Sequence, residues 1–105
     1  MDHKKVEKYI LSMPGAKLDY PFGEDVAVYK VKDKMFALIQ EKKEPVRLSL
    51  KCDPLLAETL RQKYESVLPG YHLNKKHWNT IILSGQLEWP EVQDLIRHSY
   101  NLVKN

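Results

Sequence analysis

Twelve residues in the second half of the chain carry an unusually dense set of polar and aromatic groups. The segment 69–80 contains two His, two Lys, two Asn, one Tyr and one Trp, and it directly precedes the apolar run 81–83. Such a cluster at the entrance to a strand is typical of a binding site, because the sheet holds loop residues at its ends rigidly. Cations, amides and rings suit an anionic or planar partner. The candidate contact residues in this segment are His72, Asn74, Lys75, Lys76, His77, Trp78 and Asn79.

Metal binding and catalysis would require a different arrangement of side chains. His72 and His77 are five residues apart, which matches neither a helical i, i+4 pair nor a cysteine knuckle. The third ligand would have to be Cys52, which an alternating strand pattern directs into the core. The sequence contains no GxSxG motif, phosphate-binding P-loop or GxGxxG motif. We therefore predict no metal site, no cofactor, no catalytic residue and no enzymatic activity.

Length and composition predict one domain, residues 1–105, with a single core. With 43% hydrophobic and 30% charged residues, the chain has the composition of a folded protein. One cysteine allows no internal disulfide. The first residues form no apolar signal segment, and no apolar run approaches the ~20 residues that cross a bilayer. We expect a cytoplasmic protein, monomeric and without membrane contact.

Positive charge is modest and unevenly distributed. The net charge is +3, and residues 1–52 hold 11 Lys and Arg against 8 Asp and Glu, whereas residues 53–105 hold 6 of each kind. An anion-binding surface must therefore combine the 69–80 segment with cations from the first half. The candidates from the first half are Arg47, Lys51, Lys30 and Lys34.

The hydrophobic pattern predicts an α+β domain in the order αβββαββα. Helices are expected from about residue 2 to 12, from the Asp53–Pro54 start onward, and from Pro90 onward. Strands are expected at 26–31, 35–40, 46–52, 71–74 and 78–83. In the 46–52 strand, alternation predicts that Val46, Leu48, Leu50 and Cys52 are buried, and that Arg47, Ser49 and Lys51 are exposed. Short connections favour an antiparallel sheet in a single two-layer domain, with the three helices on one face.

Several short blocks, in order along nearly the whole chain, resemble the MmcQ/YjbR family. They are residues 13–16 (MPGA), 20–23 (YPFG), 29–31 (YKV), 34–37 (KMFA), 50–54 (LKCDP), 72–80 (HLNKKHWNT) and 99–100 (SY). The resemblance implies a CyaY-like fold, also described as secretion-chaperone-like. It further implies a small cytoplasmic DNA-binding protein with a double wing of hairpins. The hairpin loop 41–44 is charge-neutral in this chain, which departs from a phosphate-binding wing.

Two kinds of partner are consistent with the candidate surface. One is DNA, bound weakly and with little sequence preference, with lysines on phosphates and Trp78 stacking or wedging. The other is a protein or peptide, held by an adaptor that presents Tyr71, His72, His77 and Trp78 as an aromatic hot spot on the His72–Thr80 surface. A pocket for a small ligand at the same place is a third alternative. A net charge of +3 fits the adaptor at least as well as the DNA-binding protein.

Overall fold

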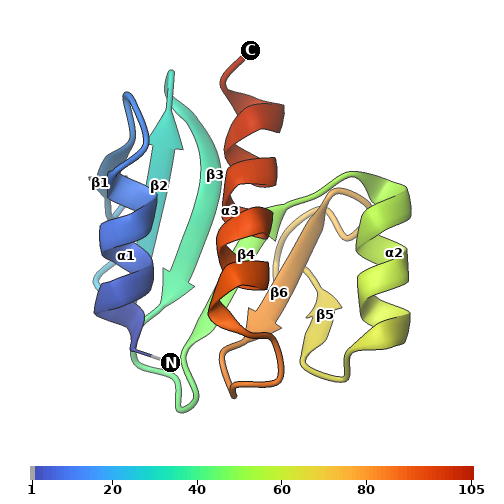
Figure 1. The fold of residues 1–105 in the computed structure, drawn as a ribbon. Helices are drawn as coiled ribbons and strands as arrows, with labels where there is room; N and C mark the ends of the chain where they lie inside the picture. Colours follow the sequence, from blue (N-terminus) through green and yellow to red (C-terminus); the bar gives the residue numbers. More distant parts are fainter. Residues whose placement is uncertain (1) are drawn as a thin grey trace.

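Three helices lie on one face of a six-stranded antiparallel sheet in the computed structural model, which describes residues 2–105 (Figure 1). The elements are α1 (His3–Leu11), β1 (Lys17–Asp19), β2 (Val26–Val31), β3 (Lys34–Gln40), β4 (Arg47–Lys51), α2 (Pro54–Lys63), β5 (Val67–Pro69), β6 (Trp78–Ile82) and α3 (Trp89–Val103). The strand order is β1-β2-β3-β4-β6-β5. The predicted α+β fold with an antiparallel sheet is confirmed.

Two short strands, β1 and β5, were not predicted, and one strand prediction was wrong. The strand β1 pairs with β2, and all three of its residues are exposed. Residues 71–74 are not a strand. The short upstream strand that pairs with β6 is β5, which ends just before this segment. His72 has a φ of 57°, which is incompatible with extended backbone. The chain therefore turns back immediately after β5, and the polar residues that follow belong to a loop.

The β2–β3 hairpin closes as the sequence indicates. Lys32 and Asp33 form a two-residue turn, and their φ angles of 52° and 64° are those of a turn that matches the twist of the flanking strands. Farther along, the register shifts between Tyr29 and Lys30, so Phe36 is an extra residue in β3. The bulge interrupts the ladder in the region where α3 crosses the sheet.

The buried hydroxyl of Ser99 on α3 bridges β3 and β4 beside this bulge. Ser99 Oγ donates to the Phe36 carbonyl oxygen at 2.5 Å and accepts from the Lys51 amide at 3.0 Å. Ser99 is completely buried. The neighbouring residues on α3 make further long-range contacts: His98 Nε2 accepts from the Asp53 amide at 3.1 Å, and the Tyr100 hydroxyl donates to the Pro14 carbonyl. One turn of α3 thus makes hydrogen bonds to three other parts of the chain.

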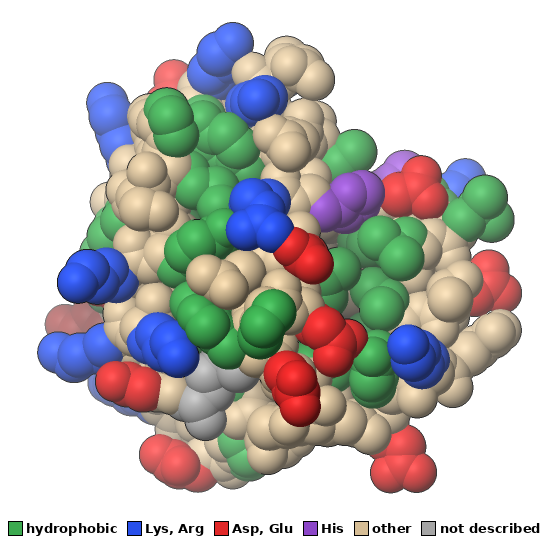
Figure 2. Space-filling model, in the orientation of Figure 1, with side chains coloured by type: hydrophobic (Ala, Val, Ile, Leu, Met, Phe, Trp, Pro, Cys, Tyr) green, Lys and Arg blue, Asp and Glu red, His purple; other side chains and the backbone are tan. Residues whose placement is uncertain are grey.

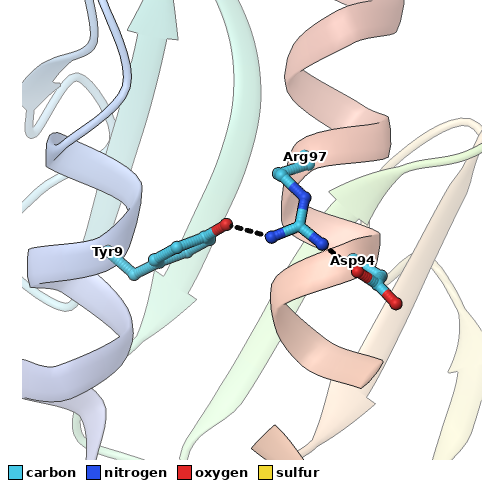
Figure 3. Close-up of polar contacts among 3 residues, drawn as sticks. All are labelled: Tyr9, Asp94 and Arg97. Atoms are coloured by element: carbon cyan, nitrogen blue, oxygen red, sulfur yellow. Dashed lines mark hydrogen bonds and ion pairs between the residues drawn. The ribbon is translucent and has the colours of Figure 1, made fainter. Parts of the chain in front are cut away.

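Polar contacts also join α1 to the rest of the helical layer. Arg97 on α3 donates to the Tyr9 hydroxyl at 2.6 Å and pairs with Asp94 one turn earlier (Figure 3). The Tyr29 hydroxyl donates to the Glu7 carboxylate at 2.8 Å, which ties α1 to β2. Burial and the adjacent carboxylate both raise the pKa of Tyr29, so the phenol remains a donor at neutral pH.

The sheet face away from the helices is less exposed to solvent than the alternation in β4 predicted. Leu48, Leu50 and Cys52 are buried as expected, and Val46 is half-buried. Ser49, however, is also buried, and Arg47 and Lys51 are only half-exposed. The reason is that β4 is central, so Ser49 is flanked in register by Leu38 and Thr80, and its hydroxyl lies 2.8 Å from that of Thr80. We call this second face of the sheet the outer face.

Candidate functional site

The loop between β5 and β6, residues 70–77, folds tightly against the start of β6. The Gly70 amide donates to the Trp78 carbonyl oxygen at 2.9 Å, and a Cβ added at Gly70 would lie 2.7 Å from the Trp78 Cβ. Only glycine allows this approach. The Tyr71 amide donates to the Thr80 hydroxyl at 3.2 Å, and Asn74 Oδ1 accepts from the Lys76 amide at 2.9 Å. Hydrogen bonds within the loop and to β6 therefore fix its conformation.

Arg61 on α2 clamps this loop from the helical side. Its guanidinium donates to the Asn79 side-chain oxygen at 2.6 Å, to the Trp78 carbonyl oxygen at 3.1 Å and to the Lys75 carbonyl oxygen. The Asn79 amide group in turn donates to the Ala57 carbonyl oxygen at 3.2 Å. Sequence reasoning missed Arg61, because a single arginine within a helical pattern gives no signal of a partner 14 to 18 residues away.

Two of the predicted contact residues lie inside the protein. Trp78 is only 8% exposed and belongs to an outer-face apolar cluster with Val28 and Leu38. Asn79 is 3% exposed and its side chain is used to join β6 to α2. Trp78 and Asn79 were predicted to contact a partner, but in this structure both side chains are buried. Both side chains pack beneath the surface, at the start of β6 where the loop ends.

The exposed groups of the loop are its cations and a pair of rings. Asn74, Lys75 and Lys76 are exposed, whereas His77 is half-buried. The rings of Tyr71 and His72 lie 4.0 Å apart between centroids and both residues are exposed, Tyr71 to 49%. Tyr71 and His72, rather than Trp78, are thus the aromatic groups available to a partner.

The cations from the first half of the chain are only partly brought to this loop. Arg47 lines the same hollow as Lys75, and Lys51 is the register partner of Trp78 at the start of β6. Lys30 is on β2, three strands from β6, and pairs with Asp19 at 3.5 Å. Lys34 begins β3 at the same end of the sheet at which Lys51 ends β4, because Ala37 pairs with Leu50 and Gln40 with Arg47. Arg47 therefore lies beside the loop cation Lys75, Lys51 adjoins the start of β6, and Lys30 lies three strands away.

Two adjoining hollows open on the outer face around Tyr71 and His72. The first, of about 430 Å³, is lined by Arg47, Leu68, Pro69, Gly70, Tyr71, His72, Lys75 and Thr80. The second, of about 320 Å³, is lined by Phe22, Val26, Leu38, Gln40, Ser49, Tyr71, His72 and Leu73. Neither lining includes an acidic residue. The first hollow, which we call the cationic hollow, suits an anion, and the second, the apolar hollow, suits a flat apolar group.

The opposite face of the molecule has a different character. On the helical side, Lys and Arg side chains are interspersed with Asp and Glu side chains among hydrophobic groups (Figure 2). Mixed charges cancel at a distance, so this side does not favour a polyanion.

The chain resembles a group of bacterial proteins over almost its full length. The YjbR family model matches residues 11–102. The chain belongs to the YjbR family. YjbR-family relatives include the Escherichia coli O157:H7 protein YbdF, 36% identical over 96% of this chain and 83% of that protein, and Escherichia coli K12 YjbR, 37% identical over 93% and 83%. Both are described as uncharacterised.

Solved structures of similar proteins have the same fold. Deinococcus radiodurans DR2400, which carries the domain DUF419, superposes with a TM-score of 0.91 at 39% identity, over 95% of this chain and 76% of that one. A crystal structure of a Pseudomonas syringae protein has a TM-score of 0.84 at 32% identity, over 98% and 99%. The family relationship therefore defines the fold and assigns no activity.

The described residues contain neither a metal-ligand cluster nor a membrane-spanning helix. Within residues 2–105, no three His, Cys, Asp or Glu side chains gather in a group that could hold a metal ion. None of the helices in that range is both long and apolar enough to span a bilayer.

Cys52 should react slowly with thiol reagents in the native protein. Its side chain is 4% exposed, and burial, together with the negative charge of Asp53, raises its pKa to about 11, so the reactive thiolate is scarce at neutral pH. Labelling with a chromogenic disulfide at pH 7 should be much slower than in denaturant, and Cys52→Ala should leave any binding unchanged. Labelling at the rate of a free thiol would show that the site opens readily.

Proposed function

We propose that this protein is a non-enzymatic DNA-binding module that binds single strands in preference to duplex, weakly and with little sequence preference. The observation that carries the proposal is the exposed Tyr71–His72 ring pair, placed between two hollows whose linings contain Arg47 and Lys75 and no acidic side chain. Proteins that bind single strands combine a cationic groove for the backbone with rings on which bases stack.

The shape of the site supports single strands over duplex. Exposed rings beside hollows can stack on bases only if those bases are unpaired, because a duplex encloses its base faces in the stack. Among the predicted contact residues, Lys75, Lys76, Asn74, Lys51 and Arg47 remain available to phosphates. A site with so few cations and a net charge of +3 should give dissociation constants on the order of micromolar or weaker at physiological salt.

The double variant Lys75→Ala with Lys76→Ala should reduce the salt dependence of binding. Each phosphate contact on a single strand contributes about −0.7 to the slope of log K against log salt, so losing two contacts should flatten the slope by roughly 1.4. The measurement is a fluorescence-anisotropy titration of oligo(dT) at several salt concentrations.

The matched control removes two exposed lysines from the helical side. Lys4→Ala with Lys8→Ala changes the net charge equally, but both residues lie on α1, away from the outer face. This control should leave the slope almost unchanged. Equal effects of the two double variants would mean that binding follows net charge alone and that the loop is not the site.

A peptide-binding adaptor is the second candidate. It is favoured by the exposed aromatic residues near the apolar hollow, Phe22 at 64% and Tyr71 at 49% exposure. Large exposed rings around a hollow are typical of protein-recognition surfaces. A folded protein with no affinity for single-stranded or duplex DNA even at low salt would reject the DNA proposal in favour of the adaptor.

A further inference from the structure

We propose that the apolar hollow holds one unstacked base of the bound strand, while the adjoining cationic hollow holds a neighbouring phosphate. This inference rests on the proposed function and adds a base subsite to it. The two hollows share Tyr71 and His72, so a ligand that spans both passes directly over the ring pair.

The lining of the apolar hollow suits a flat, mostly apolar group with a polar edge. Val26, Leu38 and Leu73 supply aliphatic contacts, and Phe22 and Tyr71 supply rings. Its volume of about 320 Å³ lies at the lower end of the range for small-ligand sites, about 300–1,000 Å³. It therefore suits a single ring system and not an extended chain.

Two buried polar atoms without hydrogen-bond partners distinguish the two hollows. Within residues 2–105, Gln40 Oε1 and Arg47 Nε are buried and make no hydrogen bond. Gln40 and Arg47 are direct cross-strand partners, so these atoms belong to adjacent positions on the outer face. Gln40 is one of the residues that line the apolar hollow, and Arg47 is one of those that line the cationic hollow.

A nucleotide that spans the two hollows could pair with both of these side chains once they turn toward it. Every nucleobase has an N–H group that could donate to Gln40 Oε1, and a phosphate oxygen could accept from Arg47 Nε with Lys75 beside it. Leaving buried polar groups unpaired is unfavourable, so a ligand that pairs them gains affinity. Because all bases share an N–H donor and a flat face, this subsite agrees with weak sequence preference.

The test compares two strands with the same phosphates. Decathymidylate and a ten-residue abasic strand carry equal backbone charge, so a phosphate-only interface would bind both equally. We expect decathymidylate to bind on the order of tenfold more tightly, in line with the effect of stacking one base. Both strands should give the same salt slope, since the number of phosphate contacts is the same.

Variants of the apolar hollow should remove this preference alone. Phe22→Ala and Gln40→Ala should each bring decathymidylate toward the affinity of the abasic strand, and leave the abasic strand unaffected. The control is Leu55→Ala, which removes a 77% exposed hydrophobic side chain from α2 on the helical side and should change neither affinity.

The possible results separate this inference from the proposed function. Equal affinities for the two strands would overturn the base subsite and the stacking on the ring pair, but would leave DNA binding through phosphates in place. A preference for decathymidylate that survives both Phe22→Ala and Gln40→Ala would place the base elsewhere and also overturn the inference. Absence of binding to either strand at low salt would overturn the proposed function and the subsite together.

Discussion

Replacing Arg61 with alanine should lower the free energy of unfolding by about 2–4 kcal/mol, because hydrogen bonds from a charged donor are worth about 1.5–3 kcal/mol each and their loss is not fully additive. The guanidinium is the donor to Asn79, Trp78 and Lys75, and its removal leaves the buried Asn79 oxygen without a partner. The loop 70–77 would lose its attachment to α2. The affinity for single-stranded DNA should therefore fall as well, although Arg61 is not itself a predicted contact. Denaturant unfolding and anisotropy titration measure the two effects.

Two further variants sharpen this test. Arg61→Lys keeps the charge but cannot reproduce the fork of donors, so most of the stability loss should remain. Gln62→Ala, at an exposed position on the same helix, should change stability by less than about 0.5 kcal/mol. If Arg61→Lys behaved as wild type, a single positive charge would be sufficient and the clamp would not depend on geometry.

Replacing Ser99 with alanine should cost about 2–5 kcal/mol of stability, because each buried polar group left without its partner costs about 1–3 kcal/mol. Both the Phe36 carbonyl and the Lys51 amide depend on this hydroxyl, and Phe36 is the extra residue at the bulge in the ladder between β2 and β3. The site is fully buried, so solvent cannot easily replace the lost bonds. Urea unfolding provides the measurement.

The control for this variant lies on the same helix. Asn101→Ala changes an exposed side chain two residues away and should cost less than about 0.5 kcal/mol. A Ser99→Ala loss as small as that of Asn101→Ala would mean that the strands close up and pair these groups with each other. The bridge would then be dispensable for joining the two halves of the sheet.

Local sequence patterns were sufficient for most of the elements. The Asp53–Pro54 pair does begin α2, and Asp53 accepts from the Leu55 and Leu56 amides as a helix cap should. Alternation in β4 correctly placed Leu48 and Leu50 in the core. These features depend on contacts within a few residues, which the chain specifies directly. The segment 71–74 failed as a strand prediction because the tight return at Gly70 depends on Trp78, eight residues ahead.

The sequence indicated where the candidate site lies, but the tertiary structure decided which of its side chains are exposed. Residue types alone indicated the 69–80 segment and its cations, and the blocks along the chain indicated the family. Which side chains are exposed was decided by pairings that sequence does not display: Lys51 beside Trp78 in register, and Arg61 against Asn79. Those contacts bury Trp78 and Asn79 and leave Tyr71 and His72 exposed. The physical reason is that the exposure of a side chain in a central strand depends on what covers the sheet, and that cover comes from residues distant in sequence.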